Sequence, residues 1–298
     1  MSLAAGLSSK LLTVSEPSPH VLHIQLARAP VNAFSTEFWT AYGALFDRIT
    51  RERRDVRAVV VSSAFPKVFS AGIDVKEGLS GGPEAADDAR ASLDLYHHLH
   101  EFQSAIGAPQ RCPVPVIAAI HGLTVGLGID LISACDVRYA ADNAQFTIKA
   151  RLPGPSSKTL FFAEVDVGLA ADIGTLAFLP KITGNHSLMH ELAYTARFFS
   201  AAEALQLGLV SQVVPGGQEG VVAAALKLAK SIAGKSPVAV AGTKRVLNHS
   251  RDHSVAENLE YVAAWNAAAL RTDDIPESLR AAQTRTAPNY KPLHKSKL

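Results

Sequence analysis

The sequence predicts an α/β fold, in which strands and helices alternate along the first half of the chain. The hydrophobic pattern there switches repeatedly between an extended and a helical period, which favours βα units and a largely parallel sheet. From Ala201 onward, helix-forming segments follow one another almost without strands. With 48% hydrophobic and 19% charged residues, the 298-residue chain can bury a substantial core.

The first elements have clear local signals. Residues 21–27 (VLHIQLA) alternate as a strand. Ser35 is a candidate N-cap for a helix with apolar residues at helical spacing, and the charged run at 51–55 (RERRD) ends that helix. The following segment, 56–63 (VRAVVVSS), is predicted to be a buried strand.

A long amphipathic helix is predicted over residues 84–108, and prolines follow it closely. Residues 114–122 (VPVIAAIHG) then form another buried strand, which enters a glycine-containing loop (GLTVGLGID) and a short apolar helix (LISACD). The apolar stripe of the long helix consists of Leu95, Leu99, Phe102 and Ile106.

The second half divides less sharply. Residues 150–163 are rich in Pro, Gly and Ser and are predicted to form an irregular loop between the strand-like QFTIK and EVDVG. We expect an α/β core over 1–214, a C-terminal helical region over 215–285 and a tail over 286–298.

Composition excludes several classes of protein. A net charge of +2 gives no field that would favour nucleic acid, and no run of about eighteen apolar residues could cross a bilayer. Cys112 and Cys135 make neither a disulfide framework nor a metal-ligand spacing. His97 and His100 could suggest a metal, but no acidic or cysteine cluster accompanies them, so a solvated helix face is favoured.

The two ends of the chain differ in their match to targeting signals. The N-terminal segment is a poor match to a secretory signal or a transit peptide. Ser296–Leu298 form SKL, a tripeptide that the peroxisomal import receptor recognises at a free C-terminus. We therefore expect a peroxisomal location and that receptor as a partner, with the mitochondrion as the alternative.

Three carboxylates in apolar surroundings are candidates for chemistry. Asp130, Glu164 and Asp172 each lie beside aliphatic residues and glycine, where a carboxylate must be desolvated, paired or used. Desolvation raises proton affinity and suits such a group to proton transfer with carbon. The alternative is structural: Asp130 could stabilise a helix N-terminus, and Asp172 could cap a helix beginning near Ile173.

Two glycine-bearing turns, at 69–75 (FSAGIDV) and 122–130 (GLTVGLGID), each follow a hydrophobic strand. Turns of this kind present backbone N–H groups that can stabilise an enolate oxygen, each worth roughly 3 kcal/mol. Gly126 and Gly128 alone do not make a dinucleotide-binding fingerprint.

The chain resembles the enoyl-CoA hydratase/isomerase, or crotonase, family from about Val21 to Trp265. FSAGIDV, HGLTVGLGIDLISACDVRYA and EVDVGLAADIGTLAFLPKITGN together carry the resemblance. Further segments, such as SRDHSVAENLEYVAAWN, are similar to the branch that isomerises dienoyl-CoA. The resemblance implies a crotonase-like fold of repeated ββα units with a C-terminal helical region. It also implies that this region, over 215–285, is an oligomerisation region of homotrimers or homohexamers.

The resemblance also implies roles for individual residues. Asp130 and Glu164 stand where the family has its acid/base carboxylates, and Asp172 stands where the dienoyl isomerase branch has an aspartate and hydratases usually have glycine. The backbone amides of Ile73 and Leu127 would form the oxyanion hole, with Leu127 replacing a glycine. Substrate or coenzyme A contacts are expected at Arg28, Ala29, Asn32, Ala71, Asp74 and Lys244.

The expected reaction is isomerisation of 3,5-dienoyl-CoA to 2,4-dienoyl-CoA in β-oxidation, with no metal and no cofactor beyond the coenzyme A of the substrate. It removes a proton at C2 and adds one at C6, ~5 Å away, so we assign Glu164 to C2 and Asp172 to C6, with Asp130 tuning the pair. Two alternatives stay open: a 2-enoyl-CoA hydratase, and a catalytically silent acyl-CoA-binding protein.

Overall fold

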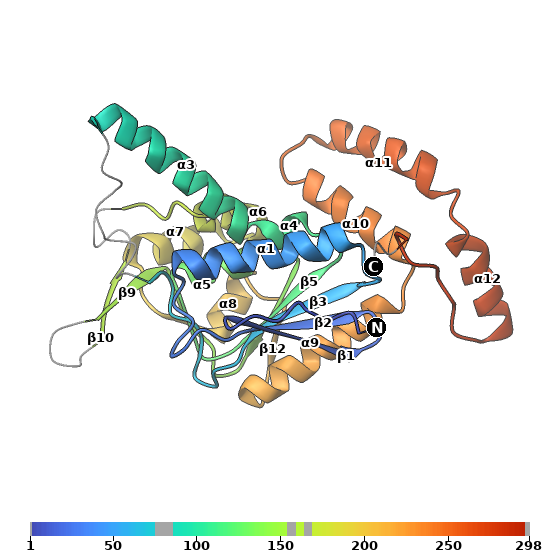
Figure 1. Cartoon of the computed structure of the whole chain (residues 1–298), viewed down its shortest axis with the longest axis horizontal. Coiled ribbons are helices and arrows are strands. Elements are labelled where there is room, and N and C mark those ends of the chain that lie inside the picture. The colour runs from blue at the N-terminus through green and yellow to red at the C-terminus, as the bar shows by residue number, and fades with distance from the viewer. Residues whose placement is uncertain (1, 75–85, 154–158, 164–168, 296–298) are drawn as a thin grey trace.

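A computed structural model describes residues 2–74, 86–153, 159–163 and 169–295 (Figure 1). Its main sheet has six strands in the order β1-β2-β3-β5-β7-β12, parallel except for the antiparallel pair β1 and β2. These strands span Leu12–Ser18, Val21–Leu26, Ala58–Ser63, Val116–Ile120, Val137–Ala141 and Gln212–Val214.

A second sheet of four strands has the order β11-β8-β6-β4. Strands β4, β6 and β8 are parallel, whereas β11 pairs with β8 in the antiparallel direction. They span Val68–Ser70 (β4), Leu123–Val125 (β6), Gln145–Thr147 (β8) and Phe199–Ser200 (β11). Strand β6 lies inside the segment that was predicted to be a loop. No strand was predicted there, because three residues are too few to show a strand period.

The helices surround these sheets (Figure 1). No described helix is long and apolar enough to cross a membrane. The helices are α1 (Thr36–Glu52), α3 (Asp88–Ile106), α4 (Ala108–Arg111), α5 (Leu127–Ser133), α6 (Thr175–Ile182), α7 (His186–Thr195), α8 (Ala201–Leu207), α9 (Gly217–Ala233), α10 (Pro237–His249), α11 (Val255–Ala269) and α12 (Asp274–Thr284).

Strand alternation divides the core into two layers. On β3, Val59 and Val61 join one cluster of buried side chains, while Ala58 and Val60 face the other, because successive side chains of a strand point to opposite faces. Helix α9 covers the second face with small residues at helical spacing, Val221, Ala225, Ala229 and Ala233. The boundary expected between residues 214 and 215 therefore lies between strand β12 and helix α9, and α9 covers the sheet to which β12 belongs.

Helix α1 confirms its predicted start and end. The Ser35 hydroxyl caps it by accepting a hydrogen bond from the Phe38 N–H, and Arg53, in the left-handed conformation, follows its last residue. In α3 the predicted stripe is buried only at Phe102 and Ile106. Leu95 is 53% exposed, because the N-terminal part of α3 extends beyond the rest of the molecule (Figure 1).

The described residues within 150–163 do not form the irregular loop that the sequence predicted. Strands β9 (Lys149–Pro153) and β10 (Thr159–Ala163) form an antiparallel hairpin in which Lys149 pairs with Ala163. The composition misled because Pro, Gly and Ser concentrate between two segments that pair with each other. Figure 1 places this hairpin at the end of the molecule opposite α11 and α12.

Candidate functional site

Asp130 lies on α5, which is buried along its whole length. Its carboxylate Oδ1 accepts hydrogen bonds from the backbone N–H of Thr175 and from the Thr175 hydroxyl, the latter at 2.8 Å. Thr175 is the first residue of α6, whose N-cap, Gly174, supplies no side-chain cap. Asp130, which lies on α5, therefore caps the N-terminus of α6. The partial positive charge at the N-terminus of α6 favours a carboxylate in this place.

Asp172 lies three residues before Thr175, in the stretch that leads into α6. Its backbone carbonyl accepts a hydrogen bond of 2.7 Å from Gln103 Nε2 on α3, and its neighbours Ala171 and Ile173 pack against the core. Partial desolvation raises the pKa of the Asp172 carboxyl above its usual value, against the effect of a hydrogen bond from its own backbone. The structure thus brings the segment that carries Asp172 up to Asp130.

Glu164 lies outside the described residues, so its predicted role stays a prediction. The hairpin nevertheless bears on its position. Because Lys149 and Ala163 are cross-strand partners, the chain leaves and re-enters the hairpin at neighbouring points. The two paired strands thus return the chain close to the place that it left, one residue before Glu164.

The two glycine-bearing turns are neighbours, as their position after the parallel strands β4 and β6 requires. Gly72 and Gly126 both have positive φ, at 87° and 49°, and each precedes a candidate donor, Ile73 or Leu127. A Cβ on Gly72 would lie 3.1 Å from the Val125 carbonyl oxygen and 3.7 Å from the Leu127 nitrogen, so this turn needs glycine.

Neither candidate donor has an acceptor among the hydrogen bonds of the described residues, so both N–H groups can bind an oxygen atom. Hydrogen bonds from Phe34 N–H to Gly72 O and from Asp74 N–H to Phe34 O hold the chain on both sides of Ile73. Leu127 itself has no positive φ. The leucine therefore does not strain the backbone at the position where it replaces a glycine.

A scan against protein-family models matched the enoyl-CoA hydratase/isomerase model to residues 16–292. The chain belongs to this family. The resemblance seen in the sequence is thereby confirmed, and so is the crotonase-like fold. An enoyl-CoA hydratase from Bacillus anthracis superposes with a TM-score of 0.80 at 28% identity, covering 95% of this chain and 99% of that one.

Relatives of known name point to one branch of the enoyl-CoA hydratase/isomerase family. The mitochondrial Δ(3,5)-Δ(2,4)-dienoyl-CoA isomerase of Homo sapiens is 47% identical over 92% of this chain and 79% of its own length. The peroxisomal protein of the same name from Arabidopsis thaliana is 39% identical over 92% of this chain and 93% of its own length.

The segment expected to contact coenzyme A in this family lies beside the Ile73 turn. Arg28 donates hydrogen bonds of 2.7 Å to the Ala33 carbonyl and to Asp74, with which it forms an ion pair. Ala29 is exposed, whereas Ala71 is buried and donates its N–H to Val31 O. The arginine and the aspartate are thus fixed by each other at the edge of the turn.

Asn32 does not have the role that the family resemblance implied. Its side chain is fully buried, donates to Ser63 Oγ and Phe69 O, and accepts from the Arg28 N–H. An amide with these partners holds its own turn, with φ of 51°, rather than a ligand. The sequence could not show this, because Ser63 and Phe69 lie more than thirty residues away.

Lys244 is a second correction. Its ammonium group is buried and contacts Pro109 O at 2.8 Å, Val114 O at 2.9 Å and the Asp136 carboxylate at 2.7 Å. These three acceptors use the three N–H donors of a lysine, so none remains for a phosphate of coenzyme A. Lys244 instead fastens α10 to the segment around α4.

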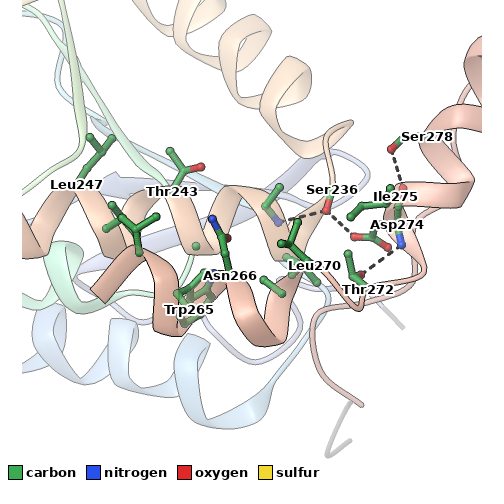
Figure 2. Close-up of a pocket in the computed structure, with 16 residues that line it drawn as sticks. Ser236, Thr243, Leu247, Trp265, Asn266, Leu270, Thr272, Asp274, Ile275 and Ser278 are labelled. Atoms are coloured by element: carbon green, nitrogen blue, oxygen red, sulfur yellow. Dashed lines mark hydrogen bonds between the residues drawn. The ribbon is translucent and has the colours of Figure 1, made fainter. Parts of the chain in front are cut away.

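A cavity of about 430 Å³ lies between α10, α11 and α12, and it contains none of the predicted acids. Figure 2 shows Trp265, Leu247 and Leu270 around it, together with the hydrogen bond from Ser236 to Asp274. Apolar side chains dominate this lining, and neither glycine-bearing turn contributes a residue to it. We therefore do not assign this cavity to catalysis.

Two residues that hold the site were missed by the sequence reasoning, Thr175 and Gln103. Gln103 lies four residues after Leu99 and three before Ile106, so a polar side chain adjoins the buried stripe of α3. That spacing could have indicated a structural role for Gln103. No local pattern indicated a role for Thr175, because its partner Asp130 is 45 residues away.

Proposed function

We propose that this chain isomerises 3,5-dienoyl-CoA to 2,4-dienoyl-CoA. The observation that carries the proposal is Asp172, a carboxylate with raised pKa whose segment is tied to Asp130 through Thr175. Support comes from relatives named as dienoyl-CoA isomerases at 39–47% identity. A hydratase needs no acid at this third position, whereas migration of a conjugated pair of double bonds does.

The reaction moves one proton and two double bonds without changing the formula of the substrate. A base removes the C2 proton, the electrons shift into a dienolate, and an acid delivers a proton to C6 as the 2,4-diene forms. We assign the base to Glu164 and the acid to Asp172, because C2 and C6 lie ~5 Å apart and proton transfer needs contact of about 3 Å.

The remaining groups stabilise the intermediate. The N–H groups of Ile73 and Leu127 would hold the thioester oxygen, on which the dienolate charge accumulates. The raised pKa of Asp172 favours the protonated acid that C6 requires. Asp130, fixed by Thr175, would tune the pair.

The test is conversion of a 3,5-dienoyl-CoA thioester, followed by the absorbance of the conjugated product. We expect Asp172→Asn to lower kcat at least about 100-fold, the usual worth of a general acid, without a change in thermal stability. Asp94→Asn, which alters an exposed aspartate on α3, is the matched control. Full activity of the Asp172 variant would refute the assignment.

The same preparation separates the alternatives. Hydration of crotonyl-CoA without diene isomerisation would identify a hydratase, the activity named for the Bacillus anthracis neighbour. Binding of both thioesters without turnover would identify an acyl-CoA-binding protein. Either result contradicts the proposed isomerase.

For location, the relatives include a peroxisomal protein in Arabidopsis thaliana and mitochondrial ones in mammals, so both compartments occur in the family. We propose the peroxisome, through recognition of Ser296–Leu298 by the import receptor. Those residues lie outside the described structure. A fluorescent protein fused to the N-terminus should reach peroxisomes, and Leu298→Glu should abolish this import.

A further inference from the structure

The four residues from Asp172 to Thr175 are anchored at both ends by side chains from other helices. At the first end, Gln103 Nε2 on α3 donates to the backbone oxygen of Asp172 at 2.7 Å. At the other end, Thr175 donates both its N–H and its hydroxyl to Asp130 Oδ1 on α5. The two anchors use different helices and different donors.

The residues between the anchors leave little room for movement. Ile173 packs against the core, and Gly174 is buried. A Cβ on Gly174 would lie 3.1 Å from the Phe178 ring and 3.6 Å from Asp130 Oδ1. In contrast, Asp172 itself is exposed. The backbone that carries its carboxyl is thus held at both ends, while the residue stays accessible.

We propose that Gln103 and Thr175 are positioning residues, which hold the Asp172 carboxyl at the place where it exchanges a proton with the far end of the acyl chain. This inference rests on the proposed isomerase function. Neither residue contacts substrate in this scheme. Because a displacement of about 1 Å at a reacting group can cost about 100-fold in rate, loss of either anchor should affect turnover more than binding.

Two substitutions remove one hydrogen bond each and conserve size. Gln103→Met keeps an unbranched side chain with good helix propensity but lacks the amide donor. Thr175→Val lacks the hydroxyl and keeps the backbone bond to Asp130. Thr175→Ser keeps the hydroxyl and is the control for Thr175→Val. Gln206→Met, which replaces an exposed glutamine of α8, is the control for Gln103→Met.

We expect Gln103→Met and Thr175→Val each to lower kcat between about tenfold and 100-fold, with KM for the 3,5-dienoyl thioester within about twofold. Thr175→Ser and Gln206→Met should stay near the wild-type kcat. A purely structural role would lower thermal stability and affect KM and kcat together.

Crystal structures of the variants provide a readout that does not depend on activity. We expect Asp172 to shift, or to gain B-factor relative to the rest of the chain, in Gln103→Met and Thr175→Val. An Asp172 position unchanged in both variants would overturn the positioning role whether or not the wild type isomerises dienes. A wild type inactive on dienes, with Asp172 displaced in both variants, would refute the proposed function and leave the anchors established.

Discussion

At the scale of single residues, His23 shows how burial sets a pH limit on the fold. It lies on β2 with 8% exposure, and its Nε2 lies 2.8 Å from Ser62 Oγ. Burial lowers the pKa of His23 from 6.5 to about 4. Between these values the unfolded chain binds a proton that the folded chain does not. The contribution of His23 to the free energy of unfolding is therefore fully present above pH 6.5 and is lost as the pH drops toward 4.

We expect His23→Gln, which has no group that titrates in this range, to lose part of that pH dependence. The change in unfolding free energy between pH 6.5 and 4.5 should be smaller than in the wild type, by about 3 kcal/mol at most. Urea unfolding at several pH values measures it. His97→Gln, at an exposed position, should keep the wild-type slope. An equal slope in both variants would show that His23 titrates normally.

At the scale of elements, the β9–β10 hairpin begins and ends at neighbouring points. Its first and last residues, Lys149 and Ala163, pair across the two strands. An element whose ends meet can be removed without stretching the chain on either side. The hairpin can therefore stand directly before a candidate catalytic residue, Glu164, in a chain that keeps the family fold.

We expect deletion of residues 150–163, which joins Lys149 to Glu164, to give a folded protein. Diene isomerisation should stay within about tenfold of the wild type, since closing or removing a surface loop changes the free energy only modestly. Circular dichroism and the diene assay measure the two properties. A folded but inactive deletion variant would mean that the hairpin contributes to the site.

At the scale of the whole molecule, the C-terminal helices carry an apolar surface that the single chain leaves uncovered. Helix α11 has no buried residue, and it lies away from the sheets with α12 (Figure 1). Large apolar residues exposed on α10–α12 and just beyond α11 are Leu247, Val255, Leu259, Leu270, Ile275 and Leu279. Exposed apolar side chains gathered on one group of helices are typical of a subunit contact, and we propose that these helices contribute to the homotrimer or homohexamer that the family resemblance implies.

Leu259→Glu places a charge on this surface, where Leu259 is 63% exposed in the single chain. We expect the variant to have a lower mass than the wild type in light scattering coupled to size exclusion, because an unpaired charge is costly in an apolar contact. Glu260→Ala, at the neighbouring exposed position, should keep the wild-type mass. An unchanged mass for Leu259→Glu would exclude α11 from the contact.

Features determined by neighbouring residues could be predicted from the sequence. The Ser35 cap, the strand at 21–26 and the helix that ends in the charged run follow from local periods and capping, and the motifs around Asp130 and Asp172 predicted the family. The antiparallel strand β1 was not predicted, because its alternation of apolar and polar residues is limited to Leu12–Ser15 and stops at Glu16 and Pro17.

Tertiary structure decided what depends on distant partners. It turned Asn32 inward toward Ser63 and Phe69, assigned Lys244 to three internal acceptors, and paired residues 149–153 with residues 159–163. It also joined Asp130 to Thr175 across 45 residues. A side chain's chemistry can be read from its type, but its partner is chosen only when sheet pairing and helix packing bring remote segments together.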